Sequence, residues 1–308
     1  MNVWDPERVV DEAMARALLR EQFPDLALDS VEPLGVGWDV TVYLVDGTWA
    51  VRFPRREVAM PALLREVALL PALAPRLPLP VPVPQLVGRP TEAYPWPFWG
   101  ARVVPGVELA DSGLGDEERS VAARDVGSFL AVLHDPSVAR QHGADLPHDP
   151  MKRAIPSTRG PMTREFLDTM AARGSWEKGS ALDRAVDEVL AAGQPLGAPD
   201  GVPVLVHGDL HLRHLLVTAE GAAAGVIDWG DACLADPALD LALAYAAFSG
   251  ASRAAFFEAY GAKPDESREL RARVLALCMC AALADHADQN GMPRILAESL
   301  AGVARATT

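Results

Sequence analysis

Two carboxylates and one imidazole lie at the ends of apolar runs in the most informative part of this chain. Asp209 follows the apolar run 204–206. Asp228 follows a second such run, 223–227, and His214 lies between the two carboxylates. Short apolar runs of this kind are typical of strands, so each carboxylate is expected at the end of a strand. One carboxylate can accept a proton from a hydroxyl group, and the other can bind a metal ion, because Mg²⁺ prefers oxygen ligands.

Protein kinases carry the same parts in the same order. Their catalytic loop, His-x-Asp-Leu-x-x-x-x-Asn, is followed by an Asp-Phe-Gly metal site. Here Asp209 stands in the place of the catalytic Asp, and His214 in that of the metal-binding Asn. Asp228 opens Asp-Trp-Gly in place of Asp-Phe-Gly. We therefore expect Asp209 to be the base and Asp228 with His214 to serve the metal. The alternative is that Asp209 and Asp228 are ordinary turn residues at strand ends. It explains less well why both motifs share the order and spacing of the kinase motifs.

The motifs around these residues resemble the aminoglycoside phosphotransferase family. The matching segments are His-Gly-Asp-Leu-His at 207–211, Ile-Asp-Trp at 227–229 and Asp-Pro-Ala-Leu-Asp-Leu at 236–241. With His214 in place of Asn, the chain resembles the macrolide phosphotransferase and aminoglycoside 2''-phosphotransferase branches, where His occurs at this position. The resemblance implies transfer of the γ-phosphate of ATP or GTP to a hydroxyl of an aminoglycoside, a macrolide or a related metabolite. It also implies Mg²⁺; Mn²⁺ is an alternative, because a softer ion accepts the imidazole of His214 more readily.

The residues expected to bind the nucleotide lie earlier in the chain. Gly35 and Gly37 fall between two expected strands, where glycine lets backbone amides approach phosphates closely, although such pairs also occur in ordinary tight turns. Arg52 occupies the strand that carries the phosphate-binding Lys of kinases, and a guanidinium can bind phosphate oxygens in a bidentate manner. Glu66 on the next helix is its expected partner. The alternative is a surface ion pair that does not contact the nucleotide.

The N-terminal part of the chain predicts a small antiparallel sheet. Asp-Pro-Glu at 5–7 is typical of a helix start, so we expect a helix from there to Gln22. Asp46-Gly47 is a strong signal for a two-residue hairpin. The expected strands are 31–34, 40–45, 48–53, 84–87 and 100–104, with a helix at 59–72 and a proline-rich link at 75–84.

The rest of the chain predicts mainly helices, at 116–134, 180–192, 237–248, 252–260, 266–290 and 294–306. The segment 141–173 is expected to be irregular, either a substrate-side insertion or a surface connection. The resemblance implies a two-lobed, protein-kinase-like fold of the α+β class. Residues 1–104 would form the nucleotide-binding lobe, and residues 105–308 the catalytic and substrate-binding lobe. The nucleotide base would meet backbone groups at the link, near Val103 and Val104.

Composition limits the partners. The net charge of −14 argues against nucleic-acid binding. It suits either a small, cationic substrate, which Asp231 could face, or a generally acidic surface without a role in binding. The three Cys residues lack metal-ligand spacing. The sequence shows neither a signal peptide nor an apolar stretch long enough to cross a bilayer, so we expect a cytoplasmic protein without a membrane partner. The oligomeric state does not follow from the sequence.

Two other functions fit the same residues. The replacements at Arg52 and His214 allow a non-catalytic, kinase-like nucleotide-binding protein, although both Asp209 and Asp228 are retained. A kinase of a primary metabolite, such as an amino alcohol or a sugar, would use the same machinery. Metal-dependent nucleotide turnover separates an enzyme from a non-catalytic binding protein. A panel of acceptors separates a kinase of a primary metabolite from an antibiotic kinase.

Overall fold

The structure is a computed structural model that describes residues 6–37 and 39–308. The chain divides into two compact units. The first comprises Met1–Pro75 and Val81–Val104, and the second comprises Arg76–Pro80 and Pro105–Thr308.

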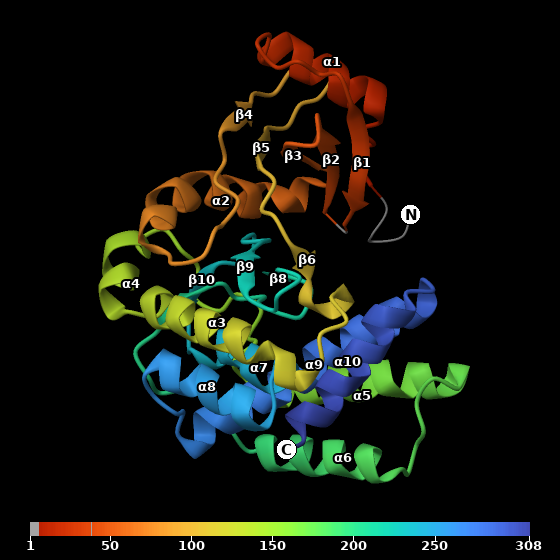
Figure 1. Cartoon of the computed structure of the whole chain (residues 1–308), viewed down its shortest axis with the longest axis vertical. Helices are drawn as coiled ribbons and strands as arrows, with labels where there is room; N and C mark the ends of the chain where they lie inside the picture. The colour runs from red at the N-terminus through yellow and green to blue at the C-terminus, as the bar shows by residue number, and fades with distance from the viewer. Residues whose placement is uncertain (1–5, 38) are drawn as a thin grey trace. The chain divides into compact units, whose positions relative to one another are not determined.

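An antiparallel sheet of five strands forms the basis of the first unit (Figure 1). Its strands are β1 (Val31–Val36), β2 (Val40–Val45), β3 (Trp49–Pro54), β4 (Leu86–Gly88) and β5 (Phe98–Arg102). They pair in the order β1-β2-β3-β5-β4. Asp46 and Gly47 join β2 to β3 with φ angles of 50° and 60°, the left-handed backbone that an Asp-Gly hairpin requires. The predicted hairpin is present, but its loop has three residues, 46–48, and not two, because Val45 pairs with Trp49.

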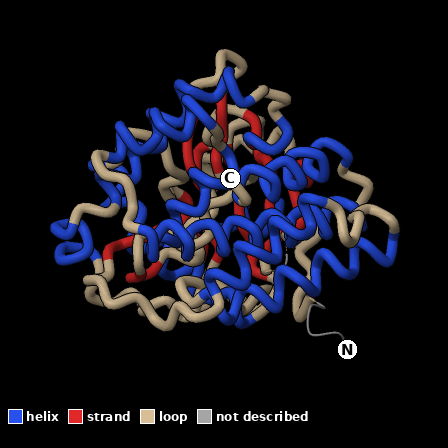
Figure 2. Tube along the Cα trace, turned by 90° about the horizontal axis from the view of Figure 1, so that it is seen from below, coloured by secondary structure: helices blue, strands red, loops and turns tan. Residues whose placement is uncertain are grey.

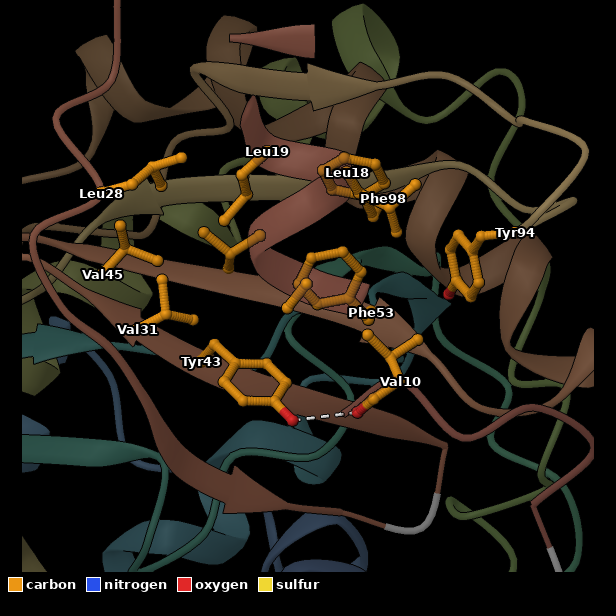
Figure 3. Close-up of a cluster of buried hydrophobic side chains, with 12 residues drawn as sticks. Val10, Leu18, Leu19, Leu28, Val31, Tyr43, Val45, Phe53, Tyr94 and Phe98 are labelled. Carbon is orange, nitrogen blue, oxygen red and sulfur yellow. Dashed lines mark hydrogen bonds between the residues drawn. The ribbon is translucent and has the colours of Figure 1, made fainter. Parts of the chain in front are cut away.

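A core of buried apolar side chains lies between this sheet and helix α1 (Glu12–Gln22) (Figure 3). Phe53 and Phe98 are fully buried there, and their rings stack with centroids 4.7 Å apart. The hydroxyl of Tyr43 donates a hydrogen bond of 3.0 Å to the carbonyl of Val10, so the polar end of this ring has a partner inside the core.

Helix α1 begins later than the sequence predicts. The expected start at Asp5 lies outside the described residues, and the segment from Pro6 to Val10 is not helical. The helix starts after Asp11, whose side chain accepts a hydrogen bond of 2.8 Å from the amide of Met14. Asp11 thereby satisfies an amide that would otherwise have no partner, and it fixes the first turn.

Helix α2 (Met60–Leu73) follows β3, close to the predicted position. The longer stretch Glu57–Arg76 has the length and apolar composition of a membrane span, which corrects the expectation that no stretch does. The core helix of a soluble protein can have the same length and apolar composition. Here Leu63 of α2 packs with Trp99 and Ala101 of the sheet, and Glu66 on the same helix is buried.

Helices predominate in the second unit (Figure 1), and the blue segments of Figure 2 are the helices of the described chain. They are α3 (Ser120–Leu133), α4 (Pro136–His142), α5 (Pro156–Arg173), α6 (Ala181–Gly193), α7 (Ala238–Ala247), α8 (Gly250–Tyr260), α9 (Glu266–Gln289) and α10 (Pro293–Ala306). The fully buried α7 packs against α9 and α10. The prediction of an irregular segment at 141–173 is wrong for its larger part, because α5 occupies residues 156–173.

Two small sheets in the same unit position the polar loops. Their strands are β6 (Val107–Glu108), β7 (Val204–Val206), β8 (Leu215–Val217), β9 (Ala223–Val226) and β10 (Cys233–Ala235). β7 pairs with β10, while β6, β8 and β9 form the other sheet, in that order. β8 and β9 are consecutive antiparallel strands and form a hairpin. The sequence did not indicate β6 and β10, which are too short to carry a pattern of their own.

Candidate active site

The loop that follows β7 is shaped by a glycine and held by a buried carboxylate. Gly208 has φ +86°, and a Cβ atom there would lie 2.3 Å from the carbonyl oxygen of Asp231, so only glycine fits. Asp240, at the start of α7, accepts hydrogen bonds from the amides of His207 (2.8 Å) and Gly208 (2.9 Å). The Nε2 atom of His134 lies 3.0 Å from the same carboxylate. These contacts fix the backbone just before Asp209.

His207 links the ends of β7 and β9, which belong to different sheets. Its Nε2 donates to the carbonyl of Ile227 at 3.0 Å, and its Nδ1 accepts a longer hydrogen bond of 3.3 Å from the amide of Asp209. Burial lowers the pKa of His207 to about 4, so the ring is neutral at physiological pH and keeps this pair of roles. His207 therefore supports the loop after β7 through both ring nitrogens.

Asp209 is half-buried, with its two carboxylate oxygens in different surroundings. Oδ1 lies 3.2 Å from a guanidinium nitrogen of Arg153. Oδ2 lies 3.8 Å from His211 Nε2 and 3.9 Å from His214 Nδ1, beyond hydrogen-bond distance. Burial raises the pKa of Asp209 to about 6, although Arg153 and His214 oppose the rise. A carboxyl group with this pKa is ionised at neutral pH and is a stronger base than an ordinary Asp.

Arg153 is a site residue that sequence reasoning missed. Its guanidinium donates to the carbonyl of Gly208 and to Oδ2 of Asp231, each at 2.8 Å. Burial would lower its pKa, but the carboxylates of Asp209 and Asp231 outweigh that effect and raise it, so the group stays charged. Arg153 lies just before α5, in the segment expected to be irregular, and no periodicity there distinguishes it from neighbouring arginines.

His214 and Asp228 come together as predicted. Nδ1 of His214 lies 2.8 Å from the backbone carbonyl of Asp209, which can only accept, so this nitrogen carries a proton. In the neutral ring, Nε2 then holds a lone pair, 3.5 Å from Oδ2 of Asp228. Two electron-pair donors so placed are favourable when a cation lies between them, so the pair fits a divalent metal ion. Asp228 has φ +65°, an uncommon backbone conformation for a residue other than glycine.

A second group of possible metal ligands overlaps the first. Single ligand atoms of Asp209, His211 and His214 lie within 4.8 Å of one another. Nδ1 of His211, however, accepts a hydrogen bond of 3.2 Å from the amide of Arg213, so its Nε2, which faces Asp209, carries the proton. Burial also lowers the pKa of His211 well below its usual value. A protonated nitrogen is not a ligand, and the His214–Asp228 pair is therefore the better cation site.

The residues expected to bind the nucleotide all belong to the first unit. The predicted ion pair is present, with Arg52 NH1 3.7 Å from Glu66 Oε1, and the Arg52 guanidinium lies over the ring of Trp99. Gly35 is part of β1, where the strand register shifts. The remaining three residues are Gly37, whose amide donates to the carbonyl of Val40; Val103, whose amide donates to the carbonyl of Thr48; and the half-buried Val104.

The chain is similar to known proteins in sequence and in fold. A model of the phosphotransferase enzyme family matches residues 30–275. The uncharacterized protein YcbJ of Bacillus subtilis (strain 168) is 40% identical over 60 residues, which span only 20% of this chain and 20% of that protein.

Solved structures match over nearly the whole chain. The GDP complex of wild-type aminoglycoside 2'-phosphotransferase-IIIa has a TM-score of 0.68 at 20% identity, covering 97% of this chain and 99% of that one. Macrolide 2'-phosphotransferase MphH from Brachybacterium faecium has a TM-score of 0.57 at 25% identity, covering 95% and 97%. The predicted kinase-like fold of the α+β class is confirmed.

Proposed function

Because this chain belongs to the phosphotransferase enzyme family, we propose that it moves the γ-phosphate of ATP or GTP to a hydroxyl of an aminoglycoside, a macrolide or a related metabolite. The observation that carries this proposal is the convergence of Asp209, His214 and Asp228 at the ends of three strands, β7, β8 and β9. One carboxylate would act as a base, and the carboxylate–imidazole pair beside it would bind a cation. Phosphoryl transfer requires both.

Asp209 is the proposed base. Its Oδ2 accepts the proton of the acceptor hydroxyl as the hydroxyl oxygen forms a bond to the γ-phosphorus. The bond from phosphorus to the leaving oxygen breaks, and the nucleoside diphosphate departs with that pair of electrons. The raised pKa of Asp209 supports this role, because proton transfer is most efficient when the pKa of the base lies near the working pH.

Asp228 Oδ2 and His214 Nε2 are the proposed ligands of a divalent cation, Mg²⁺ or alternatively Mn²⁺. When bound, such an ion neutralises charge on the phosphate groups. The chain's own contribution is to hold the two ligands in place. The Asp209 carbonyl fixes the His214 tautomer, and the positive φ of Asp228 sets the direction of its carboxylate.

The nucleotide is proposed to bind through the N-terminal lobe, residues 1–104. Relatives of this fold have been solved with GDP and with ADP, so both purine nucleotides belong in the test. Arg52 would bind phosphate oxygens, with Glu66 holding its guanidinium. The proposed contacts are Gly35, Gly37, Arg52, Glu66, Val103 and Val104.

The acceptor is proposed to bind to the C-terminal lobe, residues 105–308. Solved relatives include complexes with kanamycin, gentamicin and streptomycin, as well as macrolide 2'-phosphotransferases. Asp231 is 43% exposed while it pairs with Arg153, so its carboxylate still has an open side for a cationic group. A small-molecule partner rather than nucleic acid or membrane, and a cytoplasmic location, stay predictions.

A panel of acceptors tests the function. Purified protein is incubated with aminoglycosides, macrolides and simple amino alcohols or sugars, with ATP and GTP in parallel, and products are detected by mass. A mass gain of one phosphate on an antibiotic supports the proposal. Phosphorylation of only an amino alcohol or a sugar would instead identify a kinase of primary metabolism. Nucleotide binding without any turnover would identify a binding protein.

A further inference from the structure

We propose that Arg153 is a positioning residue for phosphoryl transfer, which holds one oxygen of Asp209 so that the other, Oδ2, accepts the proton of the acceptor hydroxyl. This inference rests on the proposed function, because it presupposes that Asp209 is the base. Arg153 acts through Asp209 and need not contact either reactant.

The first support is the set of three contacts made by one guanidinium. Arg153 NH1 donates to the carbonyl of Gly208 at 2.8 Å. Arg153 NH2 donates to Oδ2 of Asp231 at 2.8 Å and lies 3.2 Å from Oδ1 of Asp209. Gly208 immediately precedes the base, so the same side chain fixes both the backbone and the carboxylate of the loop. A planar guanidinium serves several acceptors in fixed directions, which an ammonium group cannot do.

The second support is that Arg153 is itself held rigidly. The carboxylate of Asp149 accepts hydrogen bonds from the amides of Arg153 (2.7 Å) and Ala154 (2.9 Å). The amide of Asp149 donates to the carbonyl of Leu234 in β10, at 3.0 Å. The turn before α5 is thereby tied to the strand that pairs with β7. The Arg153 side chain is only 16% exposed, so little solvent competes for its donors.

These contacts make the two oxygens of the base unequal. Oδ1 of Asp209 forms an ion pair with Arg153 at 3.2 Å, whereas Oδ2 lies 3.8 Å and 3.9 Å from the nearest nitrogens of His211 and His214. Oδ2 is therefore the oxygen with a lone pair that an incoming hydroxyl can use. Without the guanidinium, the carboxylate can rotate away from this direction. A misplacement of about 1 Å at a reacting group costs on the order of 10² in rate.

The test compares Arg153→Met with Arg173→Met in the full chain. Arg173 also joins two aspartates, Asp285 and Asp288, each at 2.6 Å, and is a matched control for the loss of such a link. Folding is checked by circular dichroism and thermal unfolding, and kcat and KM are then measured with the acceptor found in the panel. We expect Arg153→Met to lower kcat about 10²-fold, with little change in the KM for the acceptor or in the KM for the nucleotide. The groups that bind the two substrates remain, while the base is misplaced. Arg173→Met should keep the wild-type kcat.

Rescue experiments separate positioning from general support of the fold. Free guanidinium ion, added well below denaturing concentrations, should restore part of kcat to Arg153→Ala and give no gain to Arg173→Ala. Should neither Arg153→Met nor Arg153→Ala fold, Arg153→Lys keeps the charge and the stem. We expect it to have a lowered kcat at unchanged KM, because one ammonium group cannot serve three acceptors in fixed directions.

Failure of the role of Arg153 can be distinguished from failure of the proposed function. If Arg153→Met or Arg153→Lys has the wild-type kcat, the role of Arg153 is wrong. A folded Arg153→Ala that guanidinium does not rescue overturns that role too, while wild-type turnover remains. A wild-type protein that phosphorylates no acceptor and hydrolyses neither ATP nor GTP overturns the proposed function itself, and this inference with it.

Discussion

Asp209 is the residue whose replacement tests the chemistry most directly. Asn has the same shape but cannot accept a proton at neutral pH. We expect Asp209→Asn to lower kcat by roughly 10² to 10⁴, the range for loss of a positioned base, and to leave nucleotide affinity nearly unchanged. Turnover assays and calorimetric titration with Mg-nucleotide measure the two effects. Asp187→Asn, at a 59% exposed side chain, is the control. Turnover within a few fold of wild type in Asp209→Asn would exclude Asp209 as the base.

His214 provides a test of the metal site. Its Nε2 faces Asp228 Oδ2 at 3.5 Å, and Mg²⁺ prefers oxygen to imidazole nitrogen. We expect His214→Asn, which offers an amide oxygen, to shift the ratio of activity with Mg²⁺ to activity with Mn²⁺ towards Mg²⁺. The measurement is kcat/KM with each metal at saturating nucleotide. The same ratio in variant and wild type would show that His214 supports the loop and does not bind the metal.

Sequence reasoning found the residues of this site that lie within one short stretch and missed the one that comes from elsewhere. His214 and Asp228 were predicted from local spacing, and the structure brings them to 3.5 Å. Arg153 reaches Asp209 only because a turn held by Asp149 attaches to β10. Spacing along the chain does not encode such a contact, because the contact depends on the pairing of β7 with β10.

At the scale of elements, α5 shows why a helix was missed. It begins with Pro156, a favourable first position, but it contains Gly160 and Pro161, which lower intrinsic helix propensity. Its buried positions nevertheless include Thr163, Leu167 and Met170, at helical spacing. Packing of this face against α9 outweighs the weak propensity, and propensity alone gives the wrong answer.

The geometry of the loop after β7 predicts that replacing its glycine lowers the free energy of unfolding. Gly208 and Gly174 have almost the same φ, +86° and +85°, but a Cβ at Gly208 would meet the Asp231 carbonyl, whereas nothing lies within 4 Å at Gly174. Gly174→Ala should cost about 1 kcal/mol from backbone strain. Gly208→Ala carries the same strain and the clash, so its loss of unfolding free energy should be larger, with a lower kcat. Denaturant unfolding measures both variants, and equal losses would show that the loop yields to the extra atom.

Asp240, which holds the same loop from α7, predicts a dependence of stability on pH. Burial would raise its pKa, but hydrogen bonds from His134 and from the Gly208 amide outweigh burial, and the pKa is lowered. The unfolded value is about 3.9. The ionised group therefore stabilises the fold fully above that pH, and the stabilisation is lost as pH falls through the folded pKa.

The variant Asp240→Asn isolates this effect. Its deficit in unfolding free energy relative to wild type should be about 1.5 to 3 kcal/mol at neutral pH, the value of hydrogen bonds to a charged group. The deficit should shrink in acid, where wild type also loses the charge. Denaturant midpoints measured from pH 7 downwards give the comparison. A deficit that stays constant across this range would mean that ionisation of Asp240 does not matter.

At the scale of the whole molecule, the fold class followed from the family resemblance, and the local signals agreed with it. The Asp46-Gly47 turn and the order of the later helices both indicate one small sheet followed by a helical region. The parts that were missed, β6 and β10, are strands of two and three residues. Strands this short form only by pairing with β8 and β7, so the sequence alone carries no pattern that indicates them.

The net charge of −14 leads to a prediction for the whole molecule, which rests on the proposed acceptor. An acidic protein attracts a polycationic aminoglycoside over long distances, and salt screens this attraction over about 10 Å at 0.1 M. We expect kcat/KM for an aminoglycoside to fall steeply as KCl is raised, mainly through KM, while kcat/KM for a macrolide, with far less charge, falls little. The anionic nucleotide is the internal control, because screening cannot weaken its binding to an acidic protein by the same route. Equal salt slopes for aminoglycoside and macrolide would mean that short-range contacts, and not the field of the acidic surface, govern capture of the acceptor.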